Sequence, residues 1–317
     1  MKTKLLFSSF LLLSLVDACC GQKNSVNFNN VVIGVLLNDK ISIRAIEIDA
    51  DDADKLWYAG DKNRFGFYDF KEHEKTQKEI HIDSLKMEFR SMAQTKDYLF
   101  LANIGNPAYI FKVKKSDLSW EKVYEENHEK VFYDSMKFWN EQEGIAIGDP
   151  TESCLSILIT RDGGNSWKKL SCESLPKIID GEAAFAASNT NIVIKGNKTW
   201  IVSGGVKSRV FSSEDKGNSW KVIETPIVQG KAMTGIFTAD FYDENIGIIA
   251  GGNYEIPIQN FQNKAMTQDG GKTWKLIAEN AGFGYASCVQ FVPKSNGKQI
   301  VSVGASGLYY SADGGNS

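Results

Sequence analysis

The chain has 317 residues, of which 42% are hydrophobic and 24% are charged, and its formal net charge is −3. This composition is typical of a globular protein with a sizeable core and excludes a disordered chain. A small negative charge creates no field that would attract a polyanion, so it argues against nucleic acid as a partner.

The first residues have the pattern of an export signal. Lys2 and Lys4 precede an apolar run over 5–16 that is too short to span a bilayer as a stable helix. We therefore expect a signal peptide over 1–19, followed by a polar tether over 20–29. The protein would then be exported, to the periplasm or the cell surface.

Residues 16–19, Val-Asp-Ala-Cys, resemble a bacterial lipobox, in which the cysteine is lipidated and becomes the mature N-terminus. The resemblance implies a signal peptide of lipoprotein type with a lipid on Cys19, although Asp17 is unusual in such a box. The alternative is ordinary cleavage near Ala18, which leaves Cys19 unmodified. A lipid anchor would be the only contact with a membrane.

From residue 30 onward, short runs of β-branched and aromatic residues alternate with Gly, Asn or Asp, and helical periodicity is scarce. Two such runs are 191–194 and 200–203. The pattern predicts an all-β chain built from repeated units. Six units are expected, at about 41–75, 87–125, 131–172, 180–224, 233–278 and from 284 to 317.

One turn motif, [ST]-x-D-x-G-x-[ST]-W, recurs in the second half of the chain. Its repeat period of about 50 residues indicates one supersecondary unit per copy. The motif positions are Asp162, Gly164 and Trp167, then Asp215, Gly217 and Trp220, then Asp269, Gly271 and Trp274, and finally Asp313 and Gly315.

The chemistry of the motif is that of a hairpin turn. A short carboxylate accepts hydrogen bonds from backbone N–H groups ahead of it, and a glycine two residues later supplies a positive φ. Tryptophan opens the next strand, where its face packs between sheets. We interpret the motif as structural, and a ligand or Ca²⁺ role for the aspartates is the alternative.

The motif resembles the Asp-box (BNR repeat) that marks the blades of β-propellers in the sialidase-like superfamily. In that family the box lies between the third and fourth strands of a blade, away from the central channel. Segments 144–150, 181–188 and 251–254 are similar to exported photosystem II stability/assembly factor-like proteins, which often carry the label "oxidoreductase". The resemblance covers essentially the whole chain after the leader and implies an all-β fold, a β-propeller of four-stranded antiparallel blades.

The fourth copy of the motif stops at Ser317, before its tryptophan. We therefore expect 30–317 to be an incomplete propeller, truncated at its C-terminus, with seven blades in the complete chain. Residues 28–38 are candidates for the strand that closes the missing blade.

Two cysteines flank the first full turn symmetrically. Cys154 and Cys172 are equally distant from Gly163, so they would face each other across a hairpin with that turn at its tip. Export favours a disulfide between them, and two reduced cysteines are the alternative. Cys288 is expected to serve packing.

If the propeller has a ligand site, it lies where the innermost strands begin, because these ends converge at one mouth of the channel. The polar residues predicted there can hold a carboxylate or a sugar, or can simply pair with one another. They are Arg44, Arg90, Asp134, Asp149, Glu182, Tyr254 and Tyr285.

We expect a binding or assembly module without catalysis, with a protein or polysaccharide partner in the cell envelope. The enzyme alternative is a sialidase-like glycoside hydrolase that uses the channel carboxylates, although the chain has five arginines and lacks the Arg-Ile-Pro signature. The sequence contains no dinucleotide-binding motif and no CxxC motif that would support the oxidoreductase label. No cofactor is therefore expected. His73, His81 and His128 have no metal-ligand spacing, so no metal site is expected either.

Overall fold

The computed structural model describes residues 34–317, and Leu36–Ser317 form one compact unit. The predicted signal peptide, Cys19 and the tether over 20–29 lie outside the described residues. Most of the predicted closing strand, up to residue 33, lies outside them as well.

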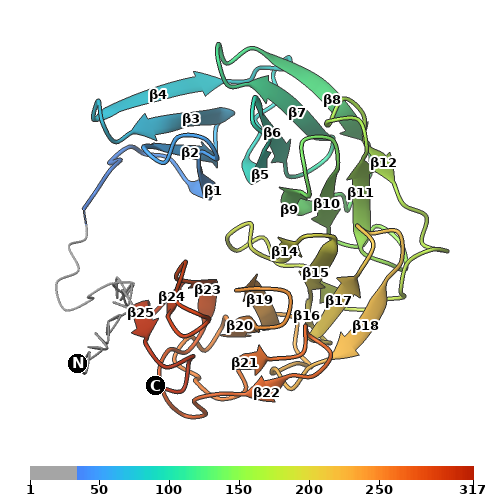
Figure 1. Cartoon of the computed structure of the whole chain (residues 1–317). Coiled ribbons are helices and arrows are strands. Elements are labelled where there is room, and N and C mark those ends of the chain that lie inside the picture. Colours follow the sequence, from blue (N-terminus) through green and yellow to red (C-terminus); the bar gives the residue numbers. More distant parts are fainter. Residues whose placement is uncertain (1–33) are drawn as a thin grey trace, which may run out of the picture. The chain divides into compact units, whose positions relative to one another are not determined.

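Every regular element in the described part is a β-strand, and successive strands pair antiparallel into blades that follow one another around a ring (Figure 1). Blade one contains β1 (Ile43–Ile48), β2 (Lys55–Gly60), β3 (Arg64–Asp69) and β4 (Glu74–Glu79). Blade two contains β5 (Phe89–Gln94), β6 (Tyr98–Asn103), β7 (Ala108–Lys114) and β8 (Trp120–Glu126). Blade three contains β9 (Tyr133–Phe138), β10 (Gly144–Gly148), β11 (Ser156–Thr160) and β12 (Lys168–Lys169).

The second half of the chain repeats this order with one addition. Blade four contains β14 (Ile192–Lys195), β15 (Lys198–Val202), β17 (Arg209–Ser213) and β18 (Lys221–Glu224). Blade five contains β19 (Thr234–Phe241), β20 (Gly247–Asn253), β21 (Lys264–Thr267) and β22 (Lys275–Leu276), and blade six contains β23 (Ala286–Phe291), β24 (Ile300–Gly304) and β25 (Gly307–Ser311). Two short strands, β13 (Glu182–Ala183) and β16 (Gly204–Gly205), extend the sheet of blade five beyond β19.

The prediction of an all-β propeller with six visible blades is confirmed, and among the described residues blade six has three strands rather than four. The innermost strands β1, β5, β9, β14, β19 and β23 contact one another in sequence around the ring. Apolar side chains fill the space between neighbouring blades, as when Phe100 of blade two stacks on Phe138 of blade three, with ring centroids 4.5 Å apart.

The recurrent turn joins the third and fourth strands of blades three, four and five. In the first copy Thr160 Oγ1 donates to Asp162 Oδ1 at 2.8 Å, and Ser166 donates to the same carboxylate through its N–H and its hydroxyl. The N–H of Gly164 donates to Thr160 Oγ1 at 2.9 Å, and this glycine has a φ of +74°. These hydrogen bonds hold the pKa of Asp162 below its ordinary value although partial burial opposes them.

The tryptophan that follows each turn packs between blades. Trp167 is buried against Phe100 of blade two and Phe138 of its own blade. Trp274 is buried against Phe241 of its own blade, in a cluster that includes Trp200 of blade four. The turns therefore fasten each outer hairpin to the neighbouring blade.

Cys154 and Cys172 are joined by a disulfide in the structure, with their Cα atoms 5.5 Å apart. The bond ties the loop before β11 to the segment after β12. Cys288 carries a free thiol on β23.

Candidate functional site

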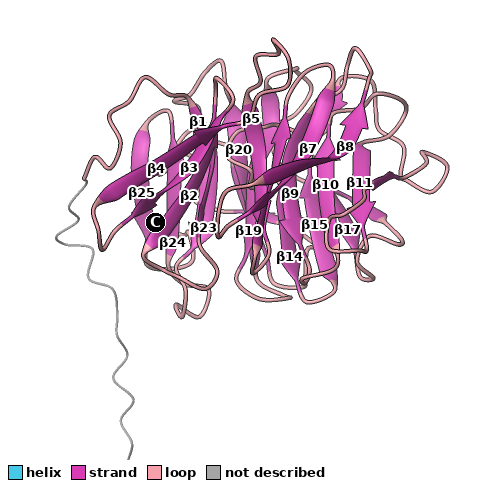
Figure 2. Cartoon of the chain, turned by 90° about the horizontal axis from the view of Figure 1, so that it is seen from above, coloured by secondary structure: helices cyan, strands magenta, loops and turns pink. Residues whose placement is uncertain are grey.

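The blades present two faces, which Figure 2 shows at opposite ends of the upright strands. One face carries the turns between the first and second strands and between the third and fourth strands of each blade. The recurrent turns that contain Asp162, Asp215 and Asp269 lie on this face. The other carries the loops between second and third strands and the connections between blades. The innermost strands begin at this second face, and we call it the mouth face.

Two arginines on neighbouring inner strands share one carboxylate at the mouth face. Arg44 lies on β1, Arg90 lies on β5, and Glu88 directly precedes β5. Glu88 Oε1 is 2.9 Å from Arg90 Nε and 3.5 Å from Arg44 Nε. The Arg44 side chain is 41% exposed and that of Arg90 is 24% exposed. The Arg90 guanidinium also lies 5.7 Å from the ring centroid of Phe132. The cluster therefore has two accessible cations for one anion.

A buried pair of carboxyl groups lies next to this cluster. Asp134 is on β9, and Asp149 follows β10, where its N–H donates to the carbonyl of Phe132 at 2.9 Å. Asp134 Oδ2 and Asp149 Oδ1 are both buried and have no hydrogen-bond partner. Burial raises the pKa of Asp149 to about 7. Burial and the neighbouring Asp149 raise the pKa of Asp134 well above its ordinary value, while Arg90 opposes the rise. The pair therefore tends to retain a proton at neutral pH.

Glu182 does not lie where the sequence predicted it. The innermost strand of blade four begins at Ile192, and Glu182 is ten residues earlier, on β13. Its carboxylate accepts from Arg209 Nε at 2.9 Å, from Ser203 Oγ at 2.6 Å and from the N–H of Ile179 at 3.0 Å. A second guanidinium nitrogen of Arg209 completes a two-pronged ion pair, and the Glu182 side chain is wholly buried. All of these contacts are internal, so this carboxylate is a packing element of the blade four connection.

Aromatic rings form a row on the opposite side of the mouth. Phe185 stacks on Phe237 with centroids 4.0 Å apart, Tyr285 meets Phe237 edge-on at 4.8 Å, and Tyr254 meets Tyr285 edge-on at 5.2 Å. Tyr285 is buried, whereas Tyr254 is 53% exposed and ends the row. The predicted pair Tyr254 and Tyr285 therefore lies together, and Phe185 and Phe237 were not predicted.

The loop that follows β20 adds an apolar surface beside this row. Its exposed large side chains, apart from Tyr254, are Ile256, Ile258 and Phe261, and Ile258 is 82% exposed. The backbone of the loop is fixed to the next connection, because the N–H of Tyr285 donates to the carbonyl of Pro257 at 2.8 Å. The mouth face thus combines a charged side over blades one to three with an aromatic and apolar side over blades five and six.

The segment before β14 joins inner strands from several blades. Asn189 donates to the carbonyl of Met92 at 2.7 Å and accepts from the N–H of Met136 at 3.2 Å. Ser188 donates to the carbonyl of Ser287 at 2.7 Å. Blades two, three and six are therefore bonded to one short segment, a contact set that the turn pattern did not reveal.

Among the described residues, no group of three or more His, Cys, Asp or Glu side chains is arranged to hold a metal ion. No helix capable of crossing a bilayer occurs in residues 34–317.

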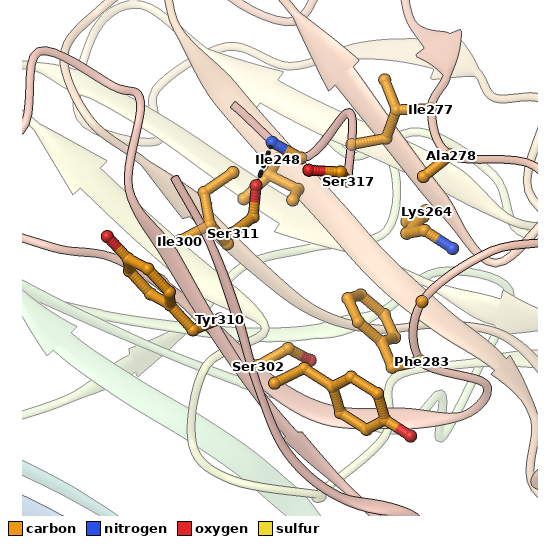
Figure 3. A pocket seen from close by; sticks show the side chains of 13 residues that line it. Ile248, Lys264, Ile277, Ala278, Phe283, Ile300, Ser302, Tyr310, Ser311 and Ser317 are labelled. Carbon is orange, nitrogen blue, oxygen red and sulfur yellow. Dashed lines mark hydrogen bonds between the residues drawn. The ribbon is translucent and has the colours of Figure 1, made fainter. Parts of the chain in front are cut away.

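A separate cavity of about 60 Å³ lies between blade five and strands β24 and β25 (Figure 3). Lys264 lines it, with Nζ donating to the carbonyl of Ala281 at 2.9 Å, and burial lowers the pKa of this lysine to about 8. Its walls are mainly apolar and include Ile248, Ile277, Phe283 and Ile300. The cavity belongs to the interface between two blades and not to the mouth.

No family model and no curated protein matches this chain. Its structure is similar to a chain in the crystal structure of the mitotic checkpoint complex, with a TM-score of 0.61 and 7% identity over 87% of this chain and 76% of that one. It is also similar to the Pan2 WD40 domain of Neurospora crassa, with a TM-score of 0.60 and 13% identity over 85% of this chain and 75% of that one. YCF48 from Cyanidioschyzon merolae matches at a TM-score of 0.48 and 13% identity, over 89% of this chain and 98% of that one. At these identities the likeness shows the β-propeller fold and no more.

Proposed function

We propose that this chain is a binding or assembly module that docks a protein partner on its mouth face. The proposal includes export by the leader and attachment to an envelope membrane through a lipid on Cys19. It also assigns the recurrent turns to the Asp-box type and the chain to the photosystem II assembly factor-like group. A polysaccharide of the cell envelope is the second candidate partner.

One observation carries the proposal: of the charged residues predicted at the mouth, the two arginines reach solvent, whereas the three acids have buried carboxyl oxygens. Arg44 and Arg90 reach solvent beside a single Glu88 carboxylate. Asp134 and Asp149 have buried oxygens, and Glu182 is locked by Arg209. Such a surface can attract and orient a carboxylate-bearing partner.

The second half of the surface supports the same proposal. Protein interfaces favour aromatic residues and arginine and are depleted of other charged residues at their centre. Tyr254, Ile258 and Phe261 provide exposed apolar area on a loop whose backbone is held in place. The similar chain in the mitotic checkpoint complex is a propeller within a multiprotein assembly, which is the class of role proposed for this chain.

A binding comparison tests the charged side. The immobilised wild type and the Arg44→Ala/Arg90→Ala double variant are incubated with an envelope extract at moderate salt, and retained proteins are identified by mass spectrometry. Arg161→Ala is the matched control, because Arg161 is a partly exposed arginine paired with Glu143 on the opposite face. We expect partners that the wild type and the control retain and the double variant loses. Identical partner sets for all three proteins would reject the mouth as the docking surface.

A glycoside hydrolase remains the second candidate function, because Asp149 has a pKa of about 7 and lies near Asp134 and Arg90. A carboxyl group that holds its proton near neutral pH is suited to act as a general acid. Fluorogenic sialoside and glucan substrates test this function. Turnover by the wild type that disappears in Asp149→Asn would establish the hydrolase function. Absence of turnover by the wild type would reject it, and the binding module would be the one remaining proposal. The oxidoreductase label gains no residue-based support.

A further inference from the structure

On the face opposite the mouth, which we call the turn face, the recurrent turn packs against an aromatic residue of the preceding blade. In blades three and five the partner is the third residue of the preceding blade's second strand. Gly164 lies against Phe100, and Gly271 lies against Trp200. A Cβ at Gly164 would come 2.1 Å from the Phe100 ring, so the approach requires glycine. Trp200 Nε1 also donates to the carbonyl of Gly270 at 2.9 Å. The turn thereby fills the space between the two blades.

Blade two has a turn of the same length that lacks this glycine. It runs from Val113 to Trp120, which pair with each other across β7 and β8. Aligned on the tryptophan, Val113 replaces the first hydroxyl residue, Lys115 replaces the aspartate and Asp117 replaces the glycine. A positive φ is found instead at Leu118, with a value of +60°. Trp120 is 39% exposed, whereas its counterparts in blades three and five are buried. The turn of blade two therefore does not close on blade one.

A cavity of about 530 Å³ lies where this turn would otherwise pack, between blades one and two, which are neighbours in the ring (Figure 1). Trp57 lines it and is the third residue of β2, the counterpart of Phe100 and Trp200. Trp57 Nε1 donates to Asp49 Oδ2 of its own blade at 2.6 Å and not to a turn of the next blade. The volume is in the range of small-ligand sites. We call this cavity the vacated turn site; the lining residues that matter below are Trp57, Phe67, Lys96, Tyr98, Lys114 and Lys115.

Lysines outnumber acids in the lining of the vacated turn site, with four lysines and two aspartates. The buried aspartate, Asp49, is already neutralised, because its Oδ2 is 2.9 Å from Lys115 Nζ and its Oδ1 accepts from two backbone N–H groups. Lys115 also donates to Gln94 Oε1 at 2.8 Å, which uses two of its three N–H donors. The second aspartate, Asp97, is exposed at the rim. Lys115 is therefore a fixed cation in the wall of the site.

The remaining lysines of the site are open to solvent and weakly paired. Lys55 Nζ is 3.3 Å from Asp52 Oδ2, and Lys114 Nζ is 3.7 Å from Asp117 Oδ2. Exposed pairs of this kind contribute little, so an anionic ligand can compete for these ammonium groups. Lys96 is exposed and has no ion-pair partner among the described residues. The rim of the site therefore attracts an anion.

Aromatic side chains complete the walls of the site. Phe67 and Tyr98 are half-buried, one on each of the two blades. An aromatic ring offers an apolar face to the C–H side of a sugar ring, and ammonium groups donate hydrogen bonds to sugar oxygens and to anionic groups. The combination of rings and lysines thus suits a ligand that is both a sugar and an anion.

We propose that the vacated turn site binds a sugar residue that carries a carboxylate or phosphate group. The anionic group pairs with Lys96 and Lys114, and the sugar ring lies against Phe67 and Tyr98. The site is on the opposite face from the mouth, so it does not depend on the function proposed for the mouth face.

Isothermal titration calorimetry of the full chain at low salt tests the proposal. Trigalacturonate and glucose 6-phosphate are the carboxylate and phosphate probes, and maltotriose is the neutral control. We expect saturable binding of at least one anionic sugar, about tenfold or more tighter than maltotriose, and weaker binding at high salt. Absence of binding by both anionic sugars would overturn the proposal. Equal binding by maltotriose, or by a hexaglutamate peptide, would overturn it as well, because either the charge or the sugar would then not be recognised.

A pair of variants locates the binding. Lys96→Ala/Lys114→Ala removes two rim ammonium groups and should weaken the binding of the anionic sugar about tenfold or more. Lys78→Ala is the matched control, because Lys78 is an exposed lysine on β4, the outer strand of blade one, and its loss should leave the affinity unchanged. An unchanged affinity in the double variant would refute the assignment of the site.

Restoring the recurrent turn in blade two adds a test with a structural readout. Val113→Thr/Lys115→Asp/Asp117→Gly completes the pattern [ST]-x-D-x-G-x-[ST]-W over 113–120. The restored turn should close on Trp57, so that sugar binding is lost and acrylamide quenches less of the tryptophan fluorescence as Trp120 becomes buried. Full sugar binding by a folded triple variant with reduced quenching would contradict the proposal. If the triple variant does not fold, the rim double variant still decides the question.

Discussion

The ion pair between Glu182 and Arg209 provides a direct test of the structural role assigned to Glu182. Both side chains are buried, and the Glu182 carboxylate also accepts hydrogen bonds from Ser203 and Ile179. Glu182→Gln keeps the size of the side chain but removes its charge and directs an amide N–H toward a guanidinium. The buried Arg209 cation then loses its counter-ion.

Removing one partner of a buried ion pair costs about 3–5 kcal/mol, because the remaining charge is left without compensation. For a domain of this size, that loss lowers the midpoint of thermal unfolding by about 6–10 °C. Replacing both partners in Glu182→Leu/Arg209→Met should cost less than either single change, since no charge remains buried.

Thermal unfolding followed by circular dichroism at pH 7 measures these differences. Glu125→Gln is the control, because Glu125 pairs with Lys122 at the surface and its loss should not move the midpoint. An unchanged midpoint for Glu182→Gln would refute the reasoning. It would indicate that Glu182 is free to serve a ligand, as the sequence pattern predicted.

Three further predictions concern pH, the disulfide and the turns. Burial raises the pKa of Asp149 from 3.8 to about 7, so the folded state holds a proton that the unfolded chain releases, and stability should fall as pH rises from about 4 to 7. Asp149→Asn should flatten this fall, by at most about 3 kcal/mol between pH 5 and pH 8, in free energies of unfolding from urea titrations at these two pH values; an unchanged slope would contradict the assignment. Reducing Cys154–Cys172, which are 18 residues apart, should lower the free energy of unfolding by about 2–4 kcal/mol in urea titrations with and without reductant. Asp215→Ala removes the hydrogen bonds of its turn and should cost about 1–2 kcal/mol in the same titration, whereas Glu214→Ala, at the exposed neighbouring residue, should be silent.

The turn motif predicted the blades because it is a local structure. The aspartate, the glycine and the two hydroxyl residues bond to one another within eight residues, so the same letters give the same conformation in every copy. The start of an inner strand is also a local feature, which is why Arg44, Arg90 and Asp134 occupy the expected positions on β1, β5 and β9. Their functional roles remain predictions.

Glu182 was misplaced because its environment is not local. The connection from β12 to β14 is long, contains β13, and carries the segment that bonds to other blades. Arg209, the partner of Glu182, is 27 residues away, and no sequence pattern predicts that pairing. The run Asn-Ile-Val-Ile over 191–194 was the available signal, since it marks the innermost strand of blade four. The rings of Phe185 and Phe237 come together for a similar non-local reason.

The position of the turns within each blade explains why they predict fold but not function. In a four-stranded antiparallel blade, the connection between third and fourth strands and the connection between second and third strands lie at opposite ends. The repeated turns therefore occupy one face, where they serve the packing of neighbouring blades. The loops of the mouth face carry no such repeat: the loop after β10 begins with Asp149, whose Oδ1 is buried, and the loop after β20 exposes Tyr254 and Ile258. Recognition by a propeller of this kind has to depend on the residues that differ between blades, because a ring of identical loops would offer the same contact at every position.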